Sequence, residues 1–166
     1  QMSAGAFFTP LDYARTFAIA VSGRKIIDLC AGIGTLAYAV RRHHPFDQDN
    51  DFDITCVEAN PDYIAVGRKI LPHARWIQAN VLDLPADIGS EYDCAISNPP
   101  FGSRKVDGKA PRYNGRHFEY KVVDVASKLA NYGVFIVPQT LSPFQISGKR
   151  TFESAPSASY TEFEEQ

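Results

Sequence analysis

The chain has 166 residues, a formal net charge of −2 and an apolar fraction of 45%, which predict one soluble globular domain with its own core. No run approaches 18 consecutive apolar residues and no signal-like leader opens the sequence, so we expect neither a membrane span nor secretion. The slight negative charge excludes a globally basic coat for nucleic acid but allows a local basic patch.

The three cysteines are far apart in the sequence. Cys30, Cys56 and Cys94 each fall inside or at the end of an apolar, strand-like run. This spacing is neither that of a metal site nor that of a disulfide framework. We therefore expect buried free thiols, no metal, and a reducing, cytoplasmic location.

Strand-like and helix-like segments alternate along the chain. Short β-branched and apolar runs predict strands at 25–29, 53–57, 74–78, 92–96 and 133–137. Apolar residues at helical spacing predict helices at 10–21, 36–42, 62–71 and 117–131. Thr9 as N-cap with Pro10 at the first helical position begins the first helix, and Pro61 begins the third.

The alternation predicts an α/β fold, a doubly wound and mostly parallel sheet with helices on both faces. In such sheets, ligands bind at the carboxyl ends of the strands, near the switch in strand order. Unusual residues follow four of the expected strands, namely Ala31 with Gly32, Glu58, Asn80 and Asn98. The sequence therefore predicts a single ligand site built from strand ends.

The first two of these strand ends indicate a nucleoside site. Gly32 and Gly34 follow the first strand, and the absence of a Cβ lets a ligand lie against the backbone. Glu58 lies thirty residues after Asp28, where its carboxylate can accept from both ribose hydroxyls. Cys30 stands where a dinucleotide fingerprint has its first glycine, so a nucleoside without pyrophosphate, such as S-adenosylmethionine, fits better.

The run Asn98-Pro99-Pro100-Phe101 ends the fourth strand. Two consecutive prolines end ladder pairing and leave nearby carbonyls without strand partners. Asn98 adds a side-chain acceptor and Phe101 a flat apolar face, which together suit a planar group that carries an NH2. Taken alone, the run also fits an ordinary turn at the end of a strand.

A basic segment follows this turn. Residues 101–116 show no periodicity and hold five cations against the single acid Asp107. The cations are Arg104, Lys105, Lys109, Arg112 and Arg116. With Tyr113 among them they suit a nucleic-acid backbone, and the alternative is a solvated loop.

Taken together, these motifs resemble those of the S-adenosylmethionine-dependent amino-methyltransferases, most closely the adenine-N6 DNA methyltransferases. The similarity covers residues 4–138 and rests on four motifs in order, at 7–10, 28–34, 58–61 and 98–101. It implies a Rossmann-like class I methyltransferase fold. Residues 1–140 would form the cofactor-binding domain, and 141–166 a tail or the incomplete end of that domain, with the closing strands of the sheet not evident.

The resemblance also implies a role for each motif. Asn98 and the carbonyl of Pro99 would accept from the target amine, next to Pro100, while Phe101 stacks on its ring. Glu58 would bind the ribose of S-adenosylmethionine. The implied cofactor residues are Phe8, Thr9, Pro10, Asp28, Ala31, Gly32, Gly34, Glu58, Ala59, Asn80 and Val81. Asn80, where the family usually has Asp, either bonds the adenine edge or serves its own turn.

Several functions share this chemistry. The leading one is transfer of a methyl group to adenine in DNA, and the alternatives are methylation of a ribosomal-RNA base or of a protein glutamine. Glutamine methyltransferases usually carry Tyr where this chain has Phe101. A catalytically silent cofactor-binding subunit is the non-enzyme alternative. No target-recognition domain follows the motifs, so a separate recognition subunit or domain is an expected partner beside DNA or RNA.

Overall fold

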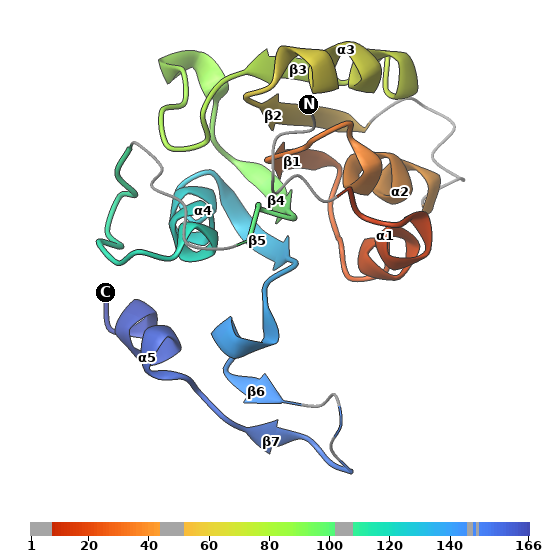
Figure 1. Cartoon of the computed structure of the whole chain (residues 1–166). Coiled ribbons are helices and arrows are strands. Elements are labelled where there is room, and N and C mark those ends of the chain that lie inside the picture. Colours follow the sequence, from red (N-terminus) through yellow and green to blue (C-terminus); the bar gives the residue numbers. More distant parts are fainter. Residues whose placement is uncertain (1–7, 44–51, 102–107, 146–147, 149) are drawn as a thin grey trace.

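The computed structural model describes residues 8–43, 52–101, 108–145, 148 and 150–166. A central sheet carries helices on both faces, and a C-terminal extension continues beyond it (Figure 1). The sheet strands are β1 (Lys25–Leu29), β2 (Asp53–Glu58), β3 (Arg75–Gln78), β4 (Tyr92–Ser97) and β5 (Ala130–Phe135). The helices are α1 (Leu11–Ala18), α2 (Thr35–His43), α3 (Pro61–Ile70), α4 (Phe118–Ala126) and α5 (Ala158–Glu164).

The strand order is β3-β2-β1-β4-β5, and every pairing in this sheet is parallel. Asp28 of β1 lies opposite Cys56 of β2 and Ile96 of β4. The chain builds outward from β1 to β3 and then returns to the other side of β1. The switch in strand order therefore falls between β1 and β4, which confirms the predicted doubly wound, Rossmann-like sheet.

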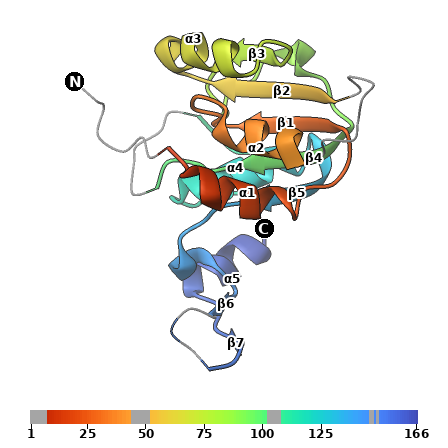
Figure 2. The same ribbon diagram turned by 90° about the vertical axis from the view of Figure 1, so that its right-hand side faces the viewer.

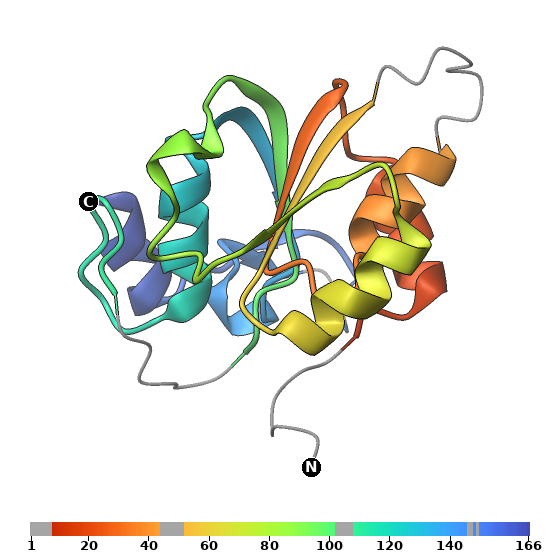
Figure 3. The ribbon, with the colours of Figure 1, turned by 90° about the horizontal axis from the view of Figure 1, so that it is seen from above.

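Two apolar layers cover the two faces of the sheet (Figure 3). On one face, α1, α2 and α3 pack over alternate strand residues such as Ile26, Ile54 and Ile96. On the other, α4 packs over residues such as Ile27 and Ala95. Successive strand residues point to opposite faces, so strands covered on both sides read as continuous apolar runs. That is why the strands could be located from the sequence.

The start of α1 differs from the prediction. The helix begins at Leu11, Pro10 is its flanking residue, and no side chain caps it. Thr9 is not an N-cap, because its hydroxyl oxygen accepts a hydrogen bond from the distant Asn98 instead. In contrast, α3 begins as expected, with Pro61 in its first turn and the side chain of Asn60 accepting from the backbone N–H of Asp62.

The boundary between α4 and β5 also differs. The prediction had a helix to residue 131 and a strand from 133, whereas α4 ends at Ala126 and β5 begins at Ala130. The Ser127 hydroxyl donates to the carbonyl of Asp124, which closes the last turn. Ala130 is already paired with Tyr92 of β4. Sheet pairing therefore overrides the helical pattern that continued through Leu129.

The C-terminal extension forms structure that the sequence pattern did not predict. A two-residue pair of antiparallel strands, β6 (Phe144–Gln145) and β7 (Glu153–Ser154), precedes α5. The extension lies on the β5 side of the sheet, away from β3 (Figure 2). Within the described part of the chain, β6 and β7 pair with each other and not with the central sheet, so the closing strands expected for the family are not among the described elements.

The described residues hold neither a membrane-spanning helix nor a cluster of metal ligands. None of the described helices is long and apolar enough to cross a membrane. In the same residues, no group of His, Cys, Asp and Glu side chains is arranged to hold a metal ion. Cys30, Cys56 and Cys94 are free thiols; Cys56 and Cys94 are buried as predicted, whereas Cys30 is half-buried.

Candidate functional site

The carboxyl ends of β1 and β4 meet at the switch point. The hydroxyl of Ser97, the last residue of β4, donates to the backbone carbonyl of Leu29, the last residue of β1. After Leu29, the backbone is left-handed at Cys30 (φ 64°), Gly32 (φ 56°) and Gly34 (φ 84°). The loop therefore turns sharply after the end of β1. At the end of the neighbouring strand β4, Asn98 directly follows Ser97. The glycine loop and the Asn-Pro-Pro-Phe turn thus start from neighbouring strand ends.

Glu58 joins this loop to the end of β2. One carboxylate oxygen accepts from the backbone N–H of Gly32 at 2.8 Å, and the other accepts from the N–H of Asn60 at 2.8 Å. A carboxylate has about four lone-pair sites, so one more hydrogen bond to each oxygen is available. Glu58 is half-buried. It is held in one orientation and can still accept from a diol.

An aromatic pair lies over the glycine loop. A Cβ placed on Gly32 would meet the ring of Phe8 at 3.7 Å. Among the described residues, no other residue has an atom within 4 Å of that Cβ. The Phe8 ring contacts Tyr63 edge-on, with centroids 5.2 Å apart. Sequence reasoning missed Tyr63. Its signal was an aromatic residue in the first turn of the helix that follows Glu58.

Asp28 lies beneath the loop. Its residue is 1% exposed, and neither carboxylate oxygen has a hydrogen-bond partner among the described residues. Burial raises the pKa of Asp28 well above its usual value, and the charge of Glu58 adds to this. A buried carboxyl whose oxygens have no partner is a group that a ligand carrying a hydrogen-bond donor or a positive charge would satisfy.

Cys30 lies between these acids. Burial raises the pKa of its thiol, and the charges of Glu58 and Asp28 raise it further. The thiolate is the nucleophilic form of cysteine. The surroundings of Cys30 therefore disfavour its thiolate form.

Asn98 is the most informative residue of the site. Its side-chain nitrogen Nδ2 donates to the hydroxyl oxygen of Thr9 at 2.8 Å. Its oxygen Oδ1 is buried and has no partner in the described structure. Pro99 is buried, Pro100 is half-buried, and Phe101 is 37% exposed at the outer end of the turn. The turn thus presents an unsatisfied acceptor beside an exposed ring.

Asn80 and Val81 follow β3, at the predicted strand end. The Asn80 side-chain oxygen accepts from the N–H of Leu82 at 3.0 Å, and its backbone carbonyl accepts from Asp83 at 2.8 Å. The side chain of Val81 is buried in the core. In this structure Asn80 serves its own turn, and the role of both residues toward adenine stays a prediction.

The predicted basic segment is only partly described. Arg104 and Lys105 lie outside the described residues, while Lys109 and Arg116 are exposed. Arg112 donates from Nε to Asp124 at 2.9 Å and from Nη2 to Ser127 at 2.8 Å, and its contact with phosphate stays a prediction. It anchors the segment to α4.

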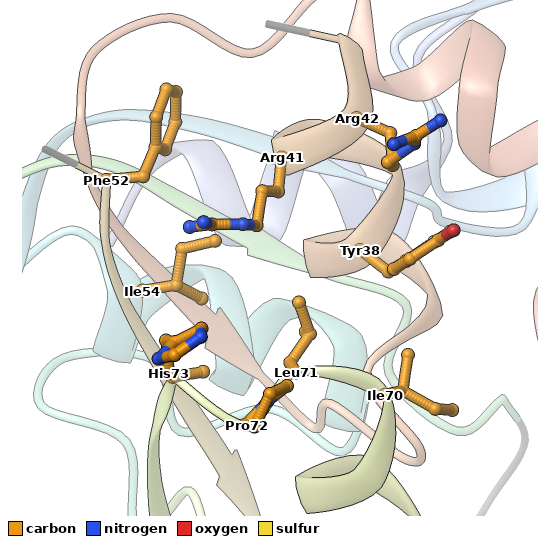
Figure 4. A pocket seen from close by; sticks show the side chains of 10 residues that line it. Tyr38, Arg41, Arg42, Phe52, Ile54, Ile70, Leu71, Pro72 and His73 are labelled. Atoms are coloured by element: carbon orange, nitrogen blue, oxygen red, sulfur yellow. The ribbon is translucent and has the colours of Figure 1, made fainter. Parts of the chain in front are cut away.

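A cavity of about 100 Å³ lies elsewhere, at the start of β2 and the ends of α2 and α3 (Figure 4). It is lined by Tyr38, Arg41, Arg42, Phe52, Ile54, Ile70, Leu71, Pro72, His73 and Ala74. Phe52 precedes β2 and Glu58 ends it, so this cavity is at the opposite end of the strand from the glycine loop. None of the predicted site residues lines it.

The fold and the strand-end geometry are those of the Rossmann-like class I methyltransferases. Residues 13–112 match the model of the methyltransferase small domain, and the chain belongs to that family. S-adenosylmethionine is accordingly its cofactor. The Cβ-free face of Gly32 beneath the Phe8 ring, the bridging carboxylate of Glu58 and the unpartnered carboxyl of Asp28 fit a nucleoside that carries a positive charge.

Relatives in sequence align with half of the chain. A release factor glutamine methyltransferase of Clostridium acetobutylicum is 24% identical over 84 residues, covering 47% of this chain and 28% of that protein. An uncharacterised protein of Mycoplasma pneumoniae is 28% identical over 82 residues, covering 47% of this chain and 17% of that protein. The chain thus spans less than a third of the length of these relatives.

Solved structures show the same fold. The methyltransferase subunit of a type I restriction-modification system from Streptococcus thermophilus superposes with a TM-score of 0.66 at 19% identity, over 86% of this chain and 36% of that one. A candidate RNA methyltransferase from Pyrococcus horikoshii gives 0.57 at 20% identity, over 79% and 63%. At such identities the likeness is one of fold, and the substrate has to be argued from the site.

Proposed function

We propose that the chain is the catalytic domain of an N-methyltransferase that methylates the exocyclic amine of adenine in DNA. The observation that carries this proposal is the buried, unpartnered Oδ1 of Asn98 beside the exposed ring of Phe101. A buried acceptor without a donor costs free energy unless a ligand satisfies it. An amine on a flat ring supplies the donor and a surface for stacking.

The cofactor, when bound, supplies an electrophilic methyl group. The chain has to make a poor nucleophile reactive, because the lone pair of a ring amine is delocalised. Asn98 Oδ1 and the backbone carbonyl of Pro99 would each accept one amine hydrogen, which favours a tetrahedral nitrogen and stabilises the developing positive charge. Holding amine and methyl donor in line supplies much of the remaining acceleration.

Recognition of the base and its strand would use other parts of the turn. A base in a duplex must be flipped out at a cost of a few kcal/mol, and stacking on Phe101 would offset part of that cost. Lys109 and Arg116 are exposed just beyond the turn and would contact phosphates, with Arg104 and Lys105 as further candidates. Selection of a target sequence would be the task of a separate recognition domain or subunit.

Methylation of a protein glutamine is the second candidate function. The alignment with the glutamine methyltransferase of Clostridium acetobutylicum favours it. A glutamine amide also presents an NH2 to an acceptor such as Asn98. Phe101, in place of the Tyr usual in those enzymes, and the Phe-Thr-Pro motif favour adenine. Methylation of an RNA base would use the same site.

The test is methyl transfer from labelled S-adenosylmethionine to DNA, ribosomal RNA and a release factor, with product identified by mass spectrometry. We expect N6-methyladenine in DNA, and a loss of rate of about 100-fold or more in Asn98→Ala with cofactor affinity retained. Asn131→Ala, on the exposed edge of β5, is the matched control. Label on RNA or on glutamine would mean that RNA or protein, and not DNA, is the substrate. Cofactor binding without product on any of the three would refute the proposal that the chain is an enzyme.

A further inference from the structure

We propose that Thr9 is a positioning residue that holds the Asn98 amide with its oxygen toward the reacting amine. This inference rests on the proposed function and deepens it. The two residues are 89 positions apart in the sequence, yet Asn98 Nδ2 lies 2.8 Å from Thr9 Oγ1. Direct binding of the cofactor, the role that the family resemblance implies for Thr9, is the competing reading.

The position of Thr9 is fixed by helix α1, which begins just after it. Thr9 directly precedes Pro10, whose carbonyl accepts from Ala14 N–H at 3.0 Å in the first turn of α1. Ala14 and Ala18 of the same helix are fully buried against α2. The position of the Thr9 hydroxyl is therefore set by the packing of α1 on α2.

The hydrogen-bonding capacity of the amide explains why a partner is needed. An asparagine side chain has two donor hydrogens on Nδ2 and two acceptor sites on Oδ1, and the two ends are almost equal in size. If Nδ2 faced the substrate amine, two hydrogen-bond donors would face each other and no hydrogen bond could form. Oδ1 can face the amine at low cost only when Nδ2 has an acceptor behind it, and Thr9 Oγ1 is that acceptor.

This arrangement also restricts the substrate. With Nδ2 bonded to Thr9, Asn98 presents a pure acceptor, so the nucleophile must carry hydrogen. An exocyclic amine or an amide NH2 meets this condition, whereas a ring nitrogen with only a lone pair would leave Oδ1 without a partner. The site thus selects NH2 groups through the 2.8 Å hydrogen bond between Asn98 Nδ2 and Thr9 Oγ1, on the side of the amide away from the substrate.

The first test is a double-mutant cycle with Thr9→Val, Thr9→Ser, Asn98→Ala and the double variant Thr9→Val/Asn98→Ala. We expect Thr9→Val to lower kcat about tenfold or more, because it leaves the half-buried Asn98 amide without an acceptor for Nδ2, while the Kd for S-adenosylmethionine stays within about twofold. Thr9→Ser should recover most of that loss. In the Asn98→Ala background, Thr9→Val should have no further effect on kcat.

Three results would overturn the proposal. A weaker Kd for the cofactor in Thr9→Val with kcat unchanged would mean that Thr9 acts on the cofactor. Equal losses from Thr9→Val in both backgrounds would mean that Thr9 does not act through Asn98. The same loss in Thr16→Val, a control on the exposed side of α1, would indicate a general effect of the substitution.

A second measurement does not depend on activity. The side-chain NH2 resonances of Asn98 can be followed by 15N NMR in the wild type and in both Thr9 variants. We expect slow hydrogen exchange in the wild type and Thr9→Ser, and faster exchange with a shifted resonance in Thr9→Val. Unchanged resonances in Thr9→Val would refute the inference even if the enzyme proposal holds. The expected changes would support it even if no substrate is methylated.

Discussion

Asp124, on the buried side of α4, holds the segment that follows the Asn-Pro-Pro-Phe turn through its contacts with Arg112. The carboxylate accepts from the Arg112 backbone N–H at 2.6 Å and from its Nε at 2.9 Å. It also accepts from the N–H of Tyr113 at 2.9 Å. Burial alone would raise the pKa of Asp124, but these N–H groups and the guanidinium outweigh it and hold that pKa below its ordinary value. The segment is thus tied to the sheet layer by a buried charge.

Asp124→Asn should destabilise the protein by about 2–3 kcal/mol at pH 7, because several hydrogen bonds lose their charged acceptor. Since the folded-state pKa is below the unfolded value, this contribution is present above the unfolded pKa and is lost as the pH falls through the folded one. Urea unfolding between pH 3 and 7 measures it. Asp87→Asn, an exposed ion pair with Arg75 at 3.4 Å, is the control and should cost less than about 0.5 kcal/mol. Equal effects of the two variants would contradict the role of Asp124.

Gly32→Ala tests the open face of the glycine loop. Gly32 has φ 56°, so a Cβ costs on the order of 1–2 kcal/mol of strain, and it would lie 3.7 Å from the Phe8 ring. We expect a folded protein whose affinity for S-adenosylmethionine falls about tenfold or more, because the added atom occupies the face against which a ligand would lie. Gly89→Ala is the control for backbone strain, because φ is 84° and ψ is 173°, a region essentially restricted to glycine, and no atom lies within 4 Å of the added Cβ. Calorimetry should show unchanged affinity in this control, and equal losses in both variants would refute the assignment.

Asp28 should make stability fall with rising pH. Its folded-state pKa is raised above the unfolded value, so the folded protein binds more protons once the unfolded carboxyl ionises near pH 4. The penalty grows from there until the pH exceeds the folded pKa. Asp28→Asn, nearly equal in volume, should therefore be more stable than wild type at pH 7 without cofactor, and should bind S-adenosylmethionine more weakly. Thermal unfolding across pH 4 to 8 checks the first effect, and parallel curves for both proteins would show that Asp28 is not the group.

The sequence allowed prediction of what depends on short-range periodicity. The apolar runs located all five sheet strands, and Glu58 and Asn98 were placed at strand ends because parallel strands direct those ends to one edge. The bond between Thr9 and Asn98 was not predictable, since it depends on how α1 packs on the sheet. Arg112 was predicted to contact phosphate because nothing in its own segment shows that a buried acid on α4 lies beside it.

Helix α5 is attached to the rest of the fold by contacts between aromatic side chains, whose spacing in the sequence follows no regular pattern. Phe163 stacks on Tyr120 of α4, with centroids 4.4 Å apart and planes 6° apart, and it contacts Tyr113 edge-on at 5.4 Å. Gln166 also accepts from the Asn114 N–H at 2.9 Å. A seven-residue helix is not stable alone, so its order depends on this contact.

Phe163→Ala should therefore release α5 and loosen residues 110–117, which follow the Asn-Pro-Pro-Phe turn in the sequence, while the central sheet stays folded. Hydrogen exchange should increase by about tenfold or more in α5 and in that segment, with strands β1 and β4 still protected. Phe152→Ala, at a 61% exposed ring that packs on Phe144, is the control and should leave the exchange of residues 110–117 unchanged. If methyl transfer also slows in Phe163→Ala and not in Phe152→Ala, the contact of Phe163 with Tyr120 and Tyr113 contributes to the activity of the site. Unchanged exchange at residues 110–117 would show that Asp124 alone holds the segment.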